Sequence, residues 1–330
     1  MNNRPGGGPA ESALNSPVDP GSGSAPPEDR GPGGAVLAGI GRGRWAIARE
    51  YLRLTRPGIV AMVLVTMGVA ALVSQPEGPA GLEWVHAITG AALVIAGALA
   101  LNQRLERMSD ARMARTASRP LPAGRLTARQ AALFGVGASA AGMAYLVLLA
   151  SPRVAALTAA SWVVYVWIYT PMKTLSAWQT PLGAVAGAMP TLIGAAAAGS
   201  FPSGVMPAAL FGIVYFWQFP HAMAIAWLHR ADFAAAKLKV ATVIDPSGRL
   251  AGWVALGGAA ALLPVSLLPC LDGRAGAGYA AMALVLGFAY LGSAAAFSRH
   301  TSDAQARRLL WASLVYLPGI CAALIGAARG

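Results

Sequence analysis

Long apolar runs separated by short polar segments fill the chain from residue 58 to residue 327. Each run is close to the twenty residues that a helix needs to cross the hydrocarbon core of a bilayer. The pattern therefore predicts an all-α, polytopic membrane protein with about nine transmembrane helices. Only Ser151-Pro152-Arg153 separates the third run from the fourth. The runs lie at residues 58–74, 84–101, 130–150, 154–172, 181–199, 205–228, 250–270, 276–297 and 308–327.

The first 44 residues have a different composition, rich in Gly, Pro and Ser. Such a segment cannot bury enough apolar surface to fold, so we expect residues 1–44 to be a disordered tail and residues 45–330 to hold the transmembrane domain. The tail contains no apolar stretch of the kind found in signal peptides. The following segment, RWAIAREYLRLTRPG, is expected to lie at the membrane interface.

Composition and charge agree with a membrane protein. The chain is 56% hydrophobic and only 12% charged, with a net charge of +12. If the N-terminus is cytoplasmic, 22 of the 25 Lys and Arg residues fall on the cytoplasmic side, as the positive-inside rule requires. The charge therefore does not point to nucleic acid as a partner. This orientation places the loops at 102–129, 170–180 and 229–249 in the cytoplasm, and the C-terminus outside.

One stretch, residues 102–121, places carboxylates at the end of an apolar run in a chain with only 13 acidic residues. Asn102, Glu106 and Asp110 are four apart, so on a helix they share a stripe of about 80° that spans roughly 12 Å. Oxygen ligands in this arrangement suit Mg²⁺ together with substrate phosphates, which Arg112, Arg115 and Arg119 are placed to bind. The alternative is an ordinary helix end followed by a positive-inside loop.

A second polar group lies around the end of the sixth run. Counting 100° per residue, Gln218, His221, Ile225 and Asp232 fall within about 60° of one another, although Pro220 should kink the helix. Polar groups at membrane depth are costly and usually functional. For His221 the alternatives are a hydrogen bond to a neighbouring helix, acid–base chemistry, or contact with a substrate or porphyrin.

A third element, Tyr169 to Lys173, ends the fourth run. Lys173 is either a phosphate ligand or a lysine that extends toward the interface. Carboxylates and basic residues above an apolar bundle predict a site in which a lipid diphosphate sits with Mg²⁺ and its tail lies between helices. Neutralising the diphosphate makes it a leaving group, so that an allylic C–O bond ionises and the cation meets an acceptor.

At these residues the chain resembles the UbiA superfamily of intramembrane prenyltransferases, and within it the protoheme IX farnesyltransferase branch. The likeness covers about residues 50 to 326. It rests on the first motif from Asn102 to Leu121, on the YTPxK of Tyr169 to Lys173, on GAVAGAMPTLIG at 183–194, and on the WQFPH of 217–221 with Asp232-Phe233 after it. The WQxPH element points to the heme branch rather than to quinone enzymes.

The resemblance implies that farnesyl diphosphate and heme B are the substrates and heme O the product, with addition of water, in a bacterial-type cell membrane. It implies Mg²⁺ at Asn102, Glu106, Asp110 and Asp232, and a clamp of Arg115, Arg119, Tyr169 and Lys173 on the diphosphate. Gln218 and His221 would face the acceptor, with His221 as a heme contact or proton carrier. Heme A synthase or oxidase assembly proteins are the partners that such a role suggests, besides membrane lipid.

The chain departs from the family pattern at Glu106 and Met108, where aspartates are usual, at Thr174, and in the segment after Asp232. These departures leave two alternatives open. One is a prenyltransferase with another acceptor, such as a quinone precursor. The other is a non-catalytic paralogue that binds heme or a prenyl lipid.

Overall fold

The computed structural model describes residues 43–75, 81–200, 204–271, 273 and 275–329. Contacts within the chain separate Met1–Arg42 from Gly43–Gly330, and the described residues all belong to the second unit. The expected tail, residues 1–44, thus lies outside the described residues except for its last two. In the part of the chain that is described, every regular element is a helix, which confirms the all-α class.

The helices follow the apolar runs closely, and nine of the helical stretches in the described residues are long and apolar enough to span a membrane. The number expected from the sequence is therefore confirmed. The bounds are α2 Arg44–Thr55, α3 Pro57–Ser74, α4 Leu82–Asp110, α5 Ala128–Tyr145, η1 Leu146–Ala150, α6 Pro152–Val163, η2 Val164–Tyr169, α7 Thr170–Leu175, α8 Gln179–Ala197, α9 Val205–Leu228, α10 Arg230–Ala235, α11 Ala241–Ile244, α12 Arg249–Leu271, α13 Ala277–Arg299 and α14 Asp303–Arg329.

The weakest expected boundary, between the third and fourth spans, lies at Ser151. This residue is extended between η1 and α6, and its hydroxyl accepts a hydrogen bond from the Arg153 amide at 3.3 Å. Pro152 occupies the first position of α6. The N–H at this position makes no hydrogen bond within a helix, so a proline costs nothing there. A single extended residue with proline after it therefore suffices to divide the two spans.

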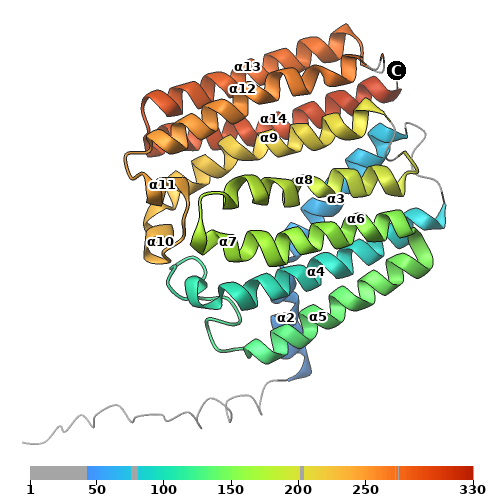
Figure 1. Ribbon diagram of the computed structural model, residues 1–330, viewed down its shortest axis with the longest axis vertical. Helices are drawn as coiled ribbons and strands as arrows, with labels where there is room; N and C mark the ends of the chain where they lie inside the picture. The colour runs from blue at the N-terminus through green and yellow to red at the C-terminus, as the bar shows by residue number, and fades with distance from the viewer. Residues whose placement is uncertain (1–42, 76–80, 201–203, 272, 274, 330) are drawn as a thin grey trace, which may run out of the picture. The chain divides into compact units, whose positions relative to one another are not determined.

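Two buried clusters hold the bundle together (Figure 1). One joins α9, α12, α13 and α14, and the other joins α3, α4, α6 and α8. Helix α8 packs against both α3 and α9 and so connects the two halves. Small residues make this possible: a Cβ at Gly194 of α8 would collide with the Met67 carbonyl oxygen of α3. Close approach of backbones at small residues is the usual way in which helices associate in membranes.

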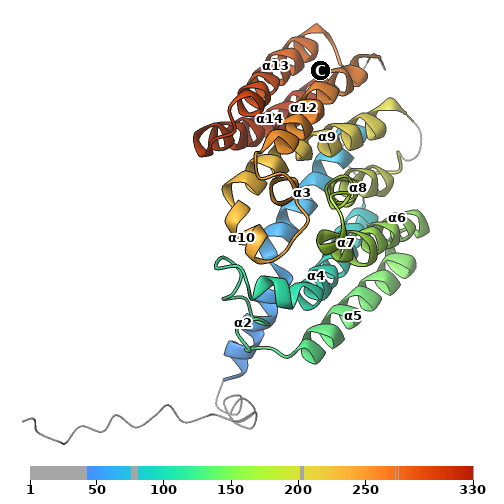
Figure 2. The ribbon, with the colours of Figure 1, turned by 60° about the vertical axis from the view of Figure 1, so that its left-hand side comes forward.

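The polar segments gather at one end of the bundle. Helix α4 continues past its apolar run to Asp110, and the loop at 111–127 lies at the same end as α7, α10 and α11 (Figure 1). Figure 2 also shows this loop beside α10, and Met113 of the loop packs with Ala236 and Leu238. The three polar loops that the sequence placed on one side of the membrane thus lie together.

Helix α2, the expected interfacial segment, is tied to this polar end. Gln103 Nε2 of α4 donates to the Leu54 carbonyl oxygen at 2.6 Å. Arg125 of the loop contacts the Glu50 carboxylate at 2.9 Å. Trp45, by contrast, is 89% exposed. An exposed tryptophan beside charged residues suits a helix at the membrane–water interface.

Candidate active site

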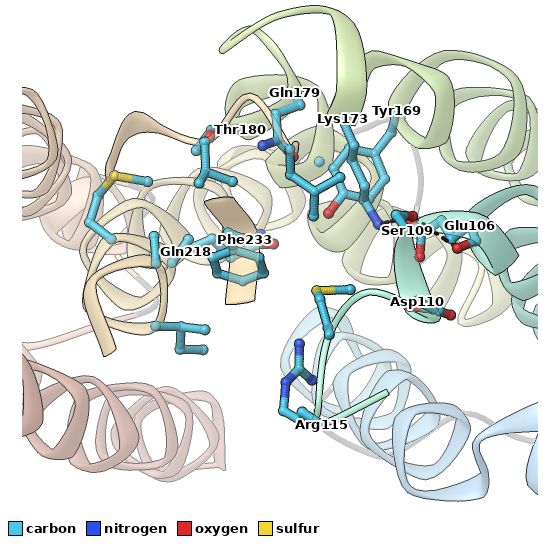
Figure 3. Close-up of a pocket in the computed structure, with 18 of the residues that line it drawn as sticks. Glu106, Ser109, Asp110, Arg115, Tyr169, Lys173, Gln179, Thr180, Gln218 and Phe233 are labelled. Carbon is cyan, nitrogen blue, oxygen red and sulfur yellow. Dashed lines mark hydrogen bonds and ion pairs between the residues drawn. The ribbon is translucent and has the colours of Figure 1, made fainter. Parts of the chain in front are cut away.

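A cavity of about 330 Å³ opens at the polar end, between the end of α4, α7, α8 and α9 (Figure 3). This volume is within the range usual for small-molecule sites. Four cationic and two acidic side chains line it, an excess of two positive charges. Its polar lining residues are Arg56, Glu106, Ser109, Asp110, Arg115, Arg119, Tyr169, Lys173, Gln179, Thr180, Gln218 and His221.

The stripe on α4 forms as the sequence predicted, because all three residues lie within one unbroken helix. Glu106 and Asp110 line the cavity. Asn102 lies one turn deeper and is 1% exposed. Its Nδ2 donates to Thr170 Oγ1 at 3.0 Å, whereas its Oδ1 is buried with no hydrogen-bond partner among the described residues. Amide and carboxylate oxygens are the kind of donor that a hard cation prefers.

Both carboxylates are held by basic residues from other segments. Lys173 Nζ lies 2.5 Å from Glu106 Oε1, and Arg119 Nη1 lies 2.6 Å from Asp110 Oδ2. Figure 3 shows Lys173 and Glu106 pointing toward each other across the cavity wall. These contacts place two of the predicted phosphate ligands directly beside the predicted metal ligands. Arg115 also lines the cavity, but Arg112 lines a neighbouring hollow instead.

A π-helical segment positions Tyr169 and Lys173. In η2 the Thr170 amide donates to the Tyr165 carbonyl, a five-residue step, and the Thr170 hydroxyl donates to the same oxygen at 2.7 Å. Pro171, which follows, has no N–H to continue an ordinary ladder. Lys173 Nζ then lies 4.4 Å from the centre of the Tyr169 ring. Single π-helical turns are common at functional sites, and nothing in the sequence pattern indicated this one.

Arg56 is a cavity residue that the sequence reasoning did not single out. It joins α2 to α3 in a left-handed conformation, with φ 49° and ψ 65°, directly before Pro57. Burial and then the nearby charge of Arg119 lower the pKa of Arg56. A half-buried cation close to another cation favours an anion between them. The only sequence signal was an arginine directly before the proline that begins a span.

On the opposite wall, Gln218, His221 and Ile225 of α9 line the cavity as expected. The expectation that Asp232 shares their face is wrong. Helix α9 ends at Leu228, and Asp232 belongs to the separate helix α10, with its carboxylate 4.0 Å from His229 Nδ1.

Asp232 is not among the residues that line this cavity. Its neighbour Phe233 lines the cavity instead (Figure 3). Within the described residues no three His, Cys, Asp or Glu side chains gather closely enough to hold a metal ion. Asn102, Glu106 and Asp110 share one face of α4, and the assignment of these three residues and Asp232 as metal ligands stays a prediction.

The chain was compared with known protein families and structures. Residues 62–315 match the model of the UbiA prenyltransferase family. The chain belongs to the UbiA prenyltransferase family. The resemblance inferred from the sequence motifs is confirmed, and with it the prediction of an integral membrane prenyltransferase.

Three relatives of this UbiA-family chain are protoheme IX farnesyltransferases. This chain is 40% identical over 283 residues to the protoheme IX farnesyltransferase of Solibacter usitatus, and the match spans 82% of this chain and 95% of the relative. It is 37% identical over 276 residues to that of Rhodopirellula baltica, covering 82% and 96%. The mitochondrial protoheme IX farnesyltransferase of Arabidopsis thaliana is 34% identical, covering 88% and 67%.

Solved structures share the fold at low identity. A digeranylgeranylglyceryl phosphate synthase superimposes with a TM-score of 0.71 at 14% identity, over 86% of this chain and 99% of that one. A UbiA homologue from Archaeoglobus fulgidus, bound to DMAPP and Mg²⁺, gives a TM-score of 0.58 at 16% identity, over 84% and 99%.

Proposed function

We propose that this protein transfers a farnesyl group from farnesyl diphosphate to a vinyl group of heme B, giving heme O. One observation carries the proposal. A single cavity joins a cationic, carboxylate-bearing mouth to a wall formed by Gln218 and His221 of the WQFPH element. Relatives that cover more than four fifths of the chain are protoheme IX farnesyltransferases, which supports heme rather than a quinone precursor as the acceptor.

The diphosphate would lie among the basic residues of the cavity. Arg56, Arg115, Arg119 and Lys173 all line it, and their charges favour a polyanion. Tyr169 stands beside Lys173 and limits where its ammonium group can lie.

Asn102, Glu106 and Asp110 would hold Mg²⁺, since their oxygens are the hard donors that it prefers. Bound Mg²⁺ would supply charge neutralisation that turns the diphosphate into a leaving group. Glu106 has a longer arm than the aspartate usual in the family, but it reaches the cavity and keeps its charge.

We further propose that the polar end faces the cytoplasm of a bacterial-type cell, with the N-terminus on the same side and the C-terminus outside. The distribution of Lys and Arg supports this orientation. Heme A synthase or an oxidase assembly protein would then receive heme O in the same membrane.

The test is heme extraction and chromatography from cells that lack their own heme O synthase, with and without this protein. We expect heme O with the parent and at least about a hundredfold less with Glu106→Gln or Lys173→Met, because each removes a charge from the diphosphate site. Glu83→Gln is the matched control, since it makes the same change in the first turn of α4, at the other end of the helix.

The outcomes separate the alternatives. No heme O from membrane-inserted parent protein would overturn the proposal. Prenylation of an aromatic acid by that protein would then identify a quinone-type acceptor, and heme binding without turnover would identify a non-catalytic paralogue. Heme O made equally well by both site variants would show that the chemistry occurs elsewhere.

A further inference from the structure

Gln218 lines the cavity, and its side-chain amide is held in one orientation. Its Nε2 donates to the Val214 carbonyl oxygen at 2.9 Å and to the Ala184 carbonyl oxygen at 3.1 Å. Two carbonyl partners fix the amide orientation, because only the NH₂ group can donate to them. Oε1 is left without a partner among the described residues, next to Gly187, where any Cβ would collide with it. The absence of a side chain at Gly187 therefore leaves space for this oxygen.

His221 presents a second acceptor. Its Nδ1 lies 2.8 Å from Ser313 Oγ of α14, and that hydroxyl donates to the Leu310 carbonyl oxygen at 2.6 Å. We assign the single hydroxyl proton of Ser313 to the Leu310 contact, and with this assignment Nδ1 carries a proton and donates to Ser313. In this tautomer Nε2 has a free lone pair, and it has no partner in the described part of the chain.

The surroundings hold the His221 ring in place. Trp217 stacks on it at 4.7 Å between ring centres with an angle of 23°, and its own Nε1 donates to the Ser313 carbonyl oxygen at 2.8 Å. Tyr290 donates to the Trp217 carbonyl oxygen at 3.0 Å. A ring fixed by a hydrogen bond and a stacked indole keeps its Nε2 lone pair in one direction.

Two fixed acceptors, three residues apart on one helix, require a ligand with two donors. Side chains at this spacing lie about 5–6 Å apart at Cβ. A water molecule that donates two hydrogen bonds of about 2.8 Å spans acceptors roughly 4.5 Å apart. A farnesyl chain and a vinyl group have no hydrogen-bond donors. Of the reactants in the proposed function, water is therefore the one that can donate to both atoms.

We propose that Gln218 and His221 hold the water molecule that adds to the carbocation formed when the prenyl group joins the vinyl group. This inference rests on the proposed function. The C–O bond to diphosphate breaks with its electron pair on the diphosphate. The terminal vinyl carbon then bonds to the prenyl carbon, leaving a cation on the carbon next to the porphyrin.

The water oxygen bonds to that cation while one of its O–H bonds breaks. His221 Nε2 takes the proton as general base and later passes it to the diphosphate, which leaves as a basic product. Gln218 takes no proton; it orients the water so that the oxygen lone pair points at the cation. Without this water, the cation loses a proton from the neighbouring carbon, and the product is an alkene lighter by one water molecule.

The experiment measures, by mass spectrometry of extracted hemes, the ratio of the dehydrated farnesyl adduct to heme O. We expect Gln218→Leu and His221→Phe to raise that ratio at least about tenfold. Ser313 lies outside the cavity lining, and Ser313→Ala removes the hydrogen-bond partner of His221 Nδ1, so it should raise the ratio as well. Ser313→Thr keeps the hydroxyl and should keep the parental ratio. Gln305→Leu, the same Gln-to-Leu change in the first turn of α14 and away from the residues that line the cavity, should leave the ratio unchanged.

Each result has a distinct meaning. No farnesyl adduct from the parent would refute the proposed function itself. A parent that makes heme O, with variants that make less of it but no dehydrated adduct, would refute the water site alone. If Gln218→Leu and His221→Phe make no adduct of any kind, the test rests on Ser313→Ala. A ratio of dehydrated adduct to heme O in Ser313→Ala equal to that of the parent would overturn the inference.

Discussion

Removing the Lys173 ammonium should destabilise the protein as well as inactivate it. Lys173→Met keeps an unbranched side chain, one heavy atom shorter, but leaves the Glu106 carboxylate without its partner at 2.5 Å. Breaking a fully buried ion pair from one side costs about 3–5 kcal/mol, and an exposed pair contributes at most about 1 kcal/mol. Because the two side chains are only 16% and 14% exposed, we expect a loss of about 2–3 kcal/mol in the free energy of unfolding.

The assay is unfolding of purified protein in mixed micelles, followed by tryptophan fluorescence. Arg53→Met is the matched control, since it also replaces a cation by methionine beside a glutamate. It should cost less than about 1 kcal/mol, because Glu50 keeps Arg125 at 2.9 Å.

The double variant Glu106→Gln/Lys173→Met separates stability from activity. With both charges gone, no unpaired charge remains, so at least about 1 kcal/mol of the loss should return. Turnover of farnesyl diphosphate should stay absent, because both groups belong to the proposed diphosphate site. A double variant whose stability loss equals the sum of the two single losses would refute this account of the pair.

Two further predictions concern the scaffold. Gly194→Ala should lower the free energy of unfolding by about 2 kcal/mol in the same micelle assay, because the new Cβ meets the backbone of Met67. Gly137→Ala is the control: nothing lies within 4 Å of a Cβ there, so this change should be neutral or stabilising. Equal effects of the two changes would contradict the packing argument. Burial raises the pKa of Glu50, but its hydrogen bonds to Arg125 and Arg53 outweigh this and lower the pKa below the usual 4.5. The stabilisation from Glu50 is therefore present above pH 4.5 and is lost as the pH falls through the lowered pKa. The parent should be more stable than Glu50→Gln by about 1 kcal/mol at pH 7, and this difference should vanish in acid. A difference that persists in acid would contradict the pKa argument.

The sequence by itself determined the spans and the stripe on α4. A bilayer requires apolar side chains and a backbone whose hydrogen bonds are made within each segment, so runs of sufficient length must become helices. Once α4 is a helix, the spacing of Asn102, Glu106 and Asp110 places them on one face, because helical periodicity is local. For the same reason Gln218, His221 and Ile225 line one wall.

Tertiary structure alone decided where the polar segments between spans lie. Whether α9 continued to Asp232 depended on contacts that local periodicity does not contain. The Thr242 hydroxyl donates to the Ala226 carbonyl oxygen at 3.0 Å, and the Lys239 amide donates to the Lys173 carbonyl oxygen at 2.8 Å. These contacts hold the segment after α9 against α9 and α7, in the arrangement that turns Phe233 to the cavity.

The partners of the site residues were decided in the same way. Glu106 and Lys173 are 67 residues apart, and Arg56 reaches the cavity through a left-handed backbone that no motif indicated. Sequence spacing fixes which residues share a helix face, because that depends on the backbone of one segment. Which faces meet depends on how all the helices pack, because each contact is made between segments that the chain brings together only on folding.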